Sequence, residues 1–133
     1  LSKEMRQIHQ WTCSSVVTPI QHGLAEFMQT CPDYIDSLSS FYEAKRDYFC
    51  KLIESSKFSY QFSAGSFYQL LDYSGISEEK DTSFAKKLTE EIGVASIPIS
   101  VFYENPPFEQ KLRFCFAKED DILEQAAEKL CRL

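Results

Sequence analysis

The sequence lacks the short motifs by which many enzymes and metal proteins are recognised. It contains no CxxC pair, no glycine-rich phosphate-binding loop, no GxSxG and no HExxH, which excludes the chemistries that those motifs mark. Histidine is scarce, because His9 and His22 are the only two, and neither stands at a metal-like spacing from a cysteine. Each is isolated from an obvious nucleophile, so a place at a surface or interface is expected rather than a role as a base.

Long apolar runs and an excess of positive charge are also missing. No segment is apolar enough to span a membrane, and none has the basic start and apolar stretch of a signal peptide. The formal net charge of −6 argues against nucleic acid as a main partner. The cysteines are odd in number and widely spaced, which predicts free thiols in a reducing cytoplasm: Cys13, Cys31, Cys50, Cys115 and Cys131. We therefore expect a cytoplasmic protein without a membrane partner.

What is present is the composition of one folded domain. The chain has 133 residues, of which 44% are hydrophobic and 14% aromatic. That length supports a single core, and the aromatic residues predict a well-filled interior or a buried interface. The first residue is Leu1 and not methionine, from which we expect a piece of a longer protein.

The first part of the chain has helical patterns separated by a loop. Residues 1–10 resemble the tail of a helix, and residues 9–17 have no helical period and predict a loop. Thr18, as a cap, and Pro19 predict the start of a further helix that ends near Thr30.

A long helix is predicted over residues 32–57, where apolar residues recur at helical spacing. A helix of that length overhangs so small a domain, which indicates contact with another domain or a partner chain. Lys45, Arg46 and Asp47 lie on its polar side and are expected to face solvent.

Strands and helices alternate over the remaining residues, 58–133. Strands are expected at 58–62 and 67–72, an extended segment at 94–99, a last strand at 112–118, and helices at 81–92 and from 119 to the end. Pro98 suits a strand end or a sheet edge, and Gly93 suits the position after a helix. This order predicts an α/β (α+β) two-layer sandwich, with helices packed on one face of a small, mainly antiparallel sheet.

The last predicted strand carries the most informative charged residue. Leu112, Phe114 and Phe116 alternate with Arg113 and Cys115, so the three large apolar side chains share one face and Arg113 points to the other. A guanidinium held on a rigid strand matches a carboxylate as a planar fork. The alternative is an arginine at a sheet edge that faces solvent or pairs with a surface glutamate. The alternation alone leaves both interpretations open.

Five segments together resemble one family. They are His9-Gln10 followed by Thr18-Pro19-Ile20-Gln21, then Tyr42-Glu43-Ala44-Lys45-Arg46-Asp47, Gly65-Ser66-Phe67-Tyr68-Gln69-Leu70-Leu71-Asp72, Gly93-Val94-Ala95-Ser96-Ile97-Pro98-Ile99-Ser100-Val101-Phe102-Tyr103 and Leu112-Arg113-Phe114-Cys115-Phe116-Ala117-Lys118. Each is weak alone, but their order and spacing resemble the C-terminal part of the class I/II aminotransferases of fold type I, which depend on pyridoxal 5'-phosphate (PLP). The subgroup is that of the methionine and kynurenine aminotransferases, which includes glutamine transaminase K.

The resemblance implies a domain organisation and a role for Arg113. The chain would be the small C-terminal domain, with residues 1–31 partly an interdomain and dimer segment, 32–57 the long interdomain helix and 58–133 the sandwich. Arg113 would bind the α-carboxylate of the substrate. Trp11 and Ser14 would lie near the partner subunit's pocket, Ser14 where the subgroup commonly has phenylalanine. The parent would be a homodimer that transfers an amino group from a methionine-, aromatic- or glutamine-like amino acid to a 2-oxo acid.

The resemblance also implies what the chain does not contain. The large PLP-binding domain, with the Schiff-base lysine, would precede it, and none of the lysines here stands in that motif. The chain alone is therefore expected to bind no PLP and to be inactive. Two alternatives stay open: a PLP-dependent C–S β-lyase, which would share the carboxylate arginine, and a non-catalytic α/β interaction domain.

Overall fold

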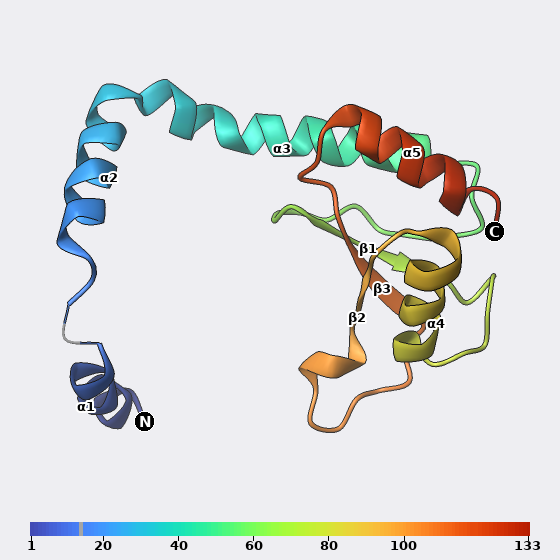
Figure 1. Ribbon diagram of the computed structural model, residues 1–133, viewed down its shortest axis with the longest axis horizontal. Coiled ribbons are helices and arrows are strands. Elements are labelled where there is room, and N and C mark those ends of the chain that lie inside the picture. Colours follow the sequence, from blue (N-terminus) through green and yellow to red (C-terminus); the bar gives the residue numbers. More distant parts are fainter. Residues whose placement is uncertain (14) are drawn as a thin grey trace. The chain divides into compact units, whose positions relative to one another are not determined.

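The computed structural model describes residues 1–13 and 15–133. They form two units, residues 1–38 and residues 39–133, and α3 (Pro32–Leu52) begins in the first and ends in the second (Figure 1). None of the described helices is both long enough and apolar enough to cross a membrane.

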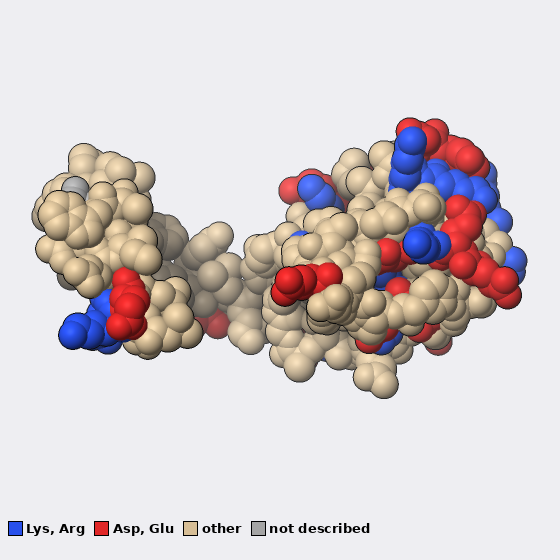
Figure 2. Space-filling model, turned by 90° about the horizontal axis from the view of Figure 1, so that it is seen from below, with Lys and Arg blue, Asp and Glu red and all other residues tan. Residues whose placement is uncertain are grey.

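The first unit contains two helices with no buried residue, α1 (Ser2–Thr12) and α2 (Thr18–Thr30). Their exposed large apolar side chains are Met5, Ile8, Trp11, Ile20, Leu24, Phe27 and Met28. Charge is sparse here: Glu26 is the only Asp, Glu, Lys or Arg between residues 7 and 31, and the left-hand part of Figure 2 shows few charged side chains on the face drawn. An apolar surface of this kind usually marks an interface.

Two details of the first unit differ from the sequence prediction. The predicted loop over residues 9–17 is wrong for its first part, because α1 continues to Thr12, whose hydroxyl donates to the carbonyls of Ile8 and His9. The second helix starts at Thr18 as predicted, but Thr18 is its first helical residue and no side chain caps it. Gln21 instead donates to the Val16 carbonyl at 2.8 Å.

The long helix α3 spans 21 residues and ends at Leu52, earlier than the predicted residue 57. It ends there because residues 53–56 turn: the Ser56 amide and hydroxyl both donate to the Ile53 carbonyl. The prediction that Lys45 and Arg46 face solvent is wrong, since the exposed fractions of their side chains are only 15% and 17%. Lys45 donates to Asp120 at 2.6 Å and so ties α3 to the start of α5 (Asp120–Leu130), which lies beside it (Figure 1).

The sheet has three strands in the order β1-β3-β2. All its pairings are antiparallel, which confirms the predicted small, mainly antiparallel sheet. They are β1 (Tyr68–Asp72), β2 (Ile97–Pro98) and β3 (Lys111–Cys115). The register places Leu71 opposite Leu112 and Gln69 opposite Phe114, and all four side chains are buried. Pro98 ends an edge strand, as expected from its missing N–H.

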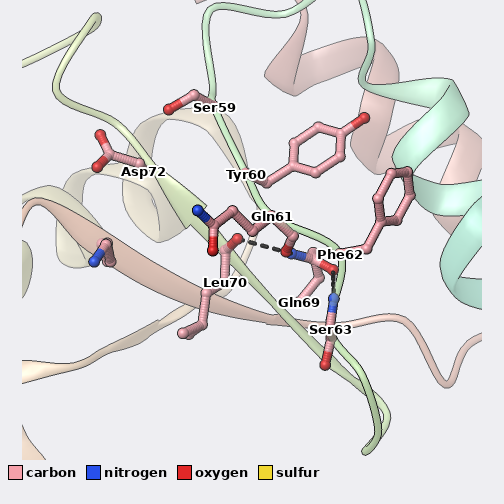
Figure 3. A pocket seen from close by; sticks show the side chains of 9 residues that line it. Ser59, Tyr60, Gln61, Phe62, Ser63, Gln69, Leu70 and Asp72 are labelled. Carbon is pink, nitrogen blue, oxygen red and sulfur yellow. Dashed lines mark hydrogen bonds between the residues drawn. The ribbon is translucent and has the colours of Figure 1, made fainter.

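The predicted strand over residues 58–62 is wrong. Only an isolated bridge joins Ser59 to Asp72. Further along, the buried side chain of Gln69 occupies the backbone groups that a strand would use: its amide donates to the Gln61 carbonyl at 2.7 Å, and its oxygen accepts from the Ser63 amide at 3.1 Å. Figure 3 shows this side chain between β1 and the segment that follows Ser59.

Helices and sheet share one core, which confirms the predicted two-layer architecture. Helix α4 (Asp81–Lys87) continues through a π-helical turn, Leu88–Ile92, to Gly93, whose φ of 74° ends the helix as predicted. The buried side chains of this core come from α3 and the turn after it, from α4 and its π-helical turn, and from α5. They include Phe49, Ile53, Phe84, Leu88, Leu123, Ala127 and Leu130.

Candidate functional site

Arg113 lies on the central strand of the sheet. The register places it between Leu70 of β1 and Ile97 of β2. Leu112 and Phe114, its neighbours in β3, are buried in the core, so the side chain of Arg113 leaves the opposite face, as the alternation predicted. The edge-strand alternative is excluded, because β3 has a partner on both sides.

Two aromatic rings hold the guanidinium of Arg113. Its central carbon lies 4.1 Å from the centroid of the Tyr68 ring and 4.8 Å from that of Phe102. A cation stacked on ring faces is attracted by their quadrupoles and loses rotational freedom. Tyr68 comes from β1, and Phe102 from the short 3-10 helix Ser100–Phe102 that follows β2. The guanidinium is therefore oriented before any ligand arrives.

The Arg113 guanidinium has hydrogen-bonding capacity left over. Its Nε is buried and finds no acceptor among the residues that the structure describes. A buried donor without an acceptor is costly, and an arginine would normally meet a carboxylate to satisfy it. None of the described carboxylates pairs with Arg113. The guanidinium is thus without a carboxylate partner in the described chain, and a planar anion from elsewhere would supply one.

A cavity of about 600 Å³ opens beside Arg113. Its walls are the segment from Gly93 to Ile97, β3 from Arg113 to Cys115, and one side of α5. Arg113, Lys118 and Lys129 line it, and no Asp or Glu of the described chain does. The hydroxyl of Ser96, also in the lining, is buried and has no hydrogen-bond partner among the described residues. The cavity is therefore positive and suits an anionic group.

A second hollow, drawn in Figure 3, offers less chemistry. It lies between β1 and residues 59–63, and its charged lining residues are Asp72 and Lys111. Asp72 accepts from the Ser74 amide at 2.9 Å, and Lys111 pairs with Glu109 at 3.2 Å. Among the described residues no cluster of three or more His, Cys, Asp or Glu could hold a metal ion.

The structure describes one of the other two predicted site residues. Trp11 stands near the end of α1 with 83% of its surface exposed. Ser14 lies outside the described residues. Their assignment to a substrate pocket stays a prediction. The sequence patterns do not single out Tyr68 or Phe102. Tyr68 shares a face with Arg113 because the register pairs Tyr68 with Cys115, and the sequence alone does not give that register.

Comparison with known proteins identifies the class. The profile of the family described as aminotransferase class I and II matches residues 1–130. The chain belongs to this family.

Within it, the chain is similar to the methionine aminotransferase of Escherichia coli (strain K12), with 38% identity over 133 residues, 100% of this chain and 34% of that protein. It is 30% identical over 147 residues to kynurenine–oxoglutarate transaminase 3 of Rattus norvegicus, covering 96% of this chain and 32% of that protein.

Solved structures agree with the sequence relatives. The crystal structure of YbdL from Escherichia coli, described as having a methionine aminotransferase function, superimposes with a TM-score of 0.88 at 39% identity, covering 99% of this chain and 35% of that one. N-succinyldiaminopimelate aminotransferase from Mycobacterium tuberculosis gives a TM-score of 0.83 at 27% identity, over 92% of this chain and 32% of that one. The chain thus spans about a third of the length of the relatives it matches.

Proposed function

We propose that this chain is the small C-terminal domain of a PLP-dependent aminotransferase, and that Arg113 binds the α-carboxylate of its substrates. The substrates would be an amino acid of methionine, aromatic or glutamine-like type and a 2-oxo acid. One observation carries the proposal: the guanidinium contacts the rings of Tyr68 and Phe102 and has a buried Nε without an acceptor among the described residues. Family membership supplies the reaction class.

The geometry explains why such a group would recognise both substrates. An amino acid and a 2-oxo acid share only the carboxylate next to the reacting carbon, and a planar fork can accept both in the same pose. Because Arg113 sits on a central strand, its Cα cannot shift without disturbing two strand pairings. Holding the carboxylate rigidly positions the reacting carbon for chemistry supplied elsewhere.

The residues around Arg113 do not form a PLP site by themselves. The cavity beside it offers cations that would suit a phosphate or a carboxylate, but no described Asp or Glu lines it to pair with a pyridine nitrogen. A PLP site also needs a lysine that forms the imine with the cofactor. We therefore propose that the cofactor is held by segments that the relatives have and this chain does not, and that the chain alone is inactive.

The first unit supports a second part of the proposal. Helices α1 and α2 bury none of their residues and expose a run of large apolar side chains. We propose that they pack against the large domain and the partner subunit of a homodimer, where Trp11 would reach a substrate pocket. A cytoplasmic location agrees with five free cysteines in the described chain. Sedimentation of the full-length protein tests the dimer.

The test is the substitution Arg113→Ala in the full-length, PLP-loaded protein that contains this chain. Losing a charge-assisted carboxylate pair should cost about 2–4 kcal/mol of transition-state binding, which lowers kcat/KM. The loss should be seen mainly as a higher KM for the amino acid. Arg132→Ala is the matched control, because Arg132 is 73% exposed and its partner among the described residues is Glu128, one helical turn away. An unchanged KM in Arg113→Ala would show that Arg113 does not bind the carboxylate.

The assay also separates the alternatives. A transaminase converts the 2-oxo acid into its amino acid, whereas a C–S β-lyase releases a thiol, ammonia and a 2-oxo acid from a cysteine conjugate. Both would use the same carboxylate arginine, so Arg113→Ala should impair either activity. A non-catalytic interaction domain would instead show neither product, with or without Arg113.

A further inference from the structure

Asp81 is a buried acid whose contacts reach well beyond its own helix. It is the first residue of α4 and only 6% exposed. Its Oδ2 accepts from the Ser100 amide at 2.7 Å, and its Oδ1 accepts from the Ser100 hydroxyl at 2.7 Å and from the Thr82 amide at 2.8 Å. None of the described lysines or arginines pairs with it. Burying a carboxylate in this way is costly unless hydrogen bonds replace its hydration.

Helix capping does not account for these contacts. A capping side chain precedes the first helical residue and accepts from an amide two or three positions further on. Asp81 is already inside the helix, Lys80 occupies the cap position, and the only α4 amide that Asp81 binds is that of Thr82. Two of its three hydrogen bonds go to Ser100, 19 residues further along the chain. Its main partner is therefore the turn after β2.

That turn carries one of the two rings on Arg113. Ser100 begins the 3-10 helix that ends at Phe102, and the Phe102 ring lies 4.8 Å from the Arg113 guanidinium carbon. Packing does not hold Phe102, because 59% of it is exposed. The residues that follow, 103–109, are exposed and lie outside helices and strands. The turn has its own backbone hydrogen bonds, from Phe102 to Ile99 and from Tyr103 to Ser100, and Asp81 ties it to the start of α4 through the amide and the hydroxyl of Ser100.

We propose that Asp81 is a positioning residue for the carboxylate clamp: it fixes Ser100, Ser100 sets the turn, and the turn holds Phe102 against the guanidinium of Arg113. This inference rests on the proposed role of Arg113. The Tyr68 and Phe102 rings both contact the guanidinium and together restrict the orientations in which it can receive a planar carboxylate. Without the Asp81 anchor, only the Tyr68 contact remains, and Arg113 must be ordered at the moment of binding.

The experiment compares Asp81→Asn and Ser100→Ala with wild type in the full-length protein. Asn keeps the shape of Asp81 but removes its charge and one of its acceptors, and Ser100→Ala removes only the hydroxyl hydrogen bond. The binding probe is 3-phenylpropionate, a monocarboxylate that cannot transaminate. Asp72→Asn is the matched control, because Asp72 also accepts a backbone amide but does not contact the turn. Hydrogen exchange of residues 99–103 reports on the turn itself.

We expect Asp81→Asn to weaken probe binding and to raise the substrate KM by about tenfold, with kcat nearly unchanged. Ser100→Ala should give a smaller change in the same direction, of about threefold. Exchange should become faster in residues 99–103 and stay unchanged in α4 and the sheet. Asp72→Asn should leave the probe affinity as it is in wild type.

Three results would overturn the inference. One is faster exchange of the turn with unaltered probe binding. Another is a general rise in exchange with a fall in kcat and a constant KM, which would indicate a structural role. A third is failure of wild type to bind the probe, which would remove the clamp itself. If Asp81→Asn does not fold, Ser100→Ala decides. If wild type binds the probe through Arg113 but transaminates no amino acid, the proposed reaction fails while the positioning role stands.

Discussion

The guanidinium carbon of Arg113 lies 4.1 Å from the centroid of the Tyr68 ring, across the pairing of the central strand with its neighbour. Tyr68 is opposite Cys115, two residues beyond Arg113. The contact is thus a diagonal cross-strand pair, which long and aromatic side chains can span. It places an aromatic platform under the one arginine of the sheet.

The Tyr68 ring should contribute to carboxylate binding through Arg113. Tyr68→Leu removes the stacked face, and a cation on a ring is worth about 0.5–2 kcal/mol, so the substrate KM should rise by roughly 2- to 30-fold. Tyr68→Phe retains the ring and is the matched control, with a KM near that of wild type. Steady-state kinetics of the PLP-loaded full-length protein measure both. Equal KM values for the Leu and Phe variants would mean that the ring does not support the clamp.

Replacing Gln69 should strongly lower the free energy of unfolding, although this residue lies on a short edge strand. It is 1% exposed and bonds the backbone at Gln61 and Ser63. Gln69→Leu would leave those groups without their partners, at about 1–3 kcal/mol each, so the free energy of unfolding should fall by about 2–4 kcal/mol. Urea denaturation measures the loss.

Gln61→Leu provides the control for Gln69. The Gln61 side chain is exposed and only its carbonyl is used, so this variant should change stability by no more than about 0.5 kcal/mol. Faster hydrogen exchange at Ser63 should appear in Gln69→Leu alone. A Gln69→Leu protein as stable as wild type would show that the segment after Ser59 finds other partners.

Tyr73 should make the fold sensitive to alkali. Burial raises the pKa of the Tyr73 phenol to about 12, and its hydroxyl donates to the Glu79 carbonyl at 2.8 Å. Between pH 10 and about 12 the unfolded chain has lost this proton while the folded chain keeps it. The contribution of Tyr73 to stability is therefore complete below pH 10 and falls as the pH rises through this window, by on the order of 2 kcal/mol.

Tyr73→Phe isolates this effect. The variant should lose about 1 kcal/mol at neutral pH through the missing hydrogen bond. Its stability should then decline less steeply than that of wild type above pH 10. Urea denaturation at several pH values gives both slopes. Parallel curves for the two proteins would show that Tyr73 ionises at the ordinary pKa of a phenol.

Cys50 should be the slowest of the thiols to react. It is 1% exposed, and burial raises the pKa of its thiol to about 11, while the thiolate is the reactive form. Iodoacetamide should therefore modify Cys50 only when the second unit unfolds, and Cys115 and Cys131, which are partly exposed, should react earlier. Peptide mass spectrometry over time follows each site. Rapid labelling of Cys50 in folded protein would contradict its place in the core.

Local patterns determined several features of this protein without any structure. The alternation of Leu112, Phe114 and Phe116 put Arg113 on the face away from the core, because a strand has a period of two whatever it pairs with. Pro98 indicated a strand end or a sheet edge, and Gly93 indicated the end of the helical segment that begins at Asp81, because each reflects the backbone of its own residue. Five motifs in order were enough to indicate the family, which the profile match to residues 1–130 confirms.

Tertiary structure alone decided what surrounds Arg113. The stacking of Tyr68 and Phe102 depends on strand register and on the anchoring of Ser100 by Asp81, which is 19 residues away in sequence. The same reason explains the errors. The strand predicted over residues 58–62 does not form, because the Gln69 side chain bonds the backbone groups of Gln61 and Ser63. No local sequence pattern predicts that a glutamine side chain takes these bonds. Lys45 is mostly buried because it pairs with Asp120, 75 residues later. The local sequence pattern shows only that Lys45 is polar and does not predict this contact.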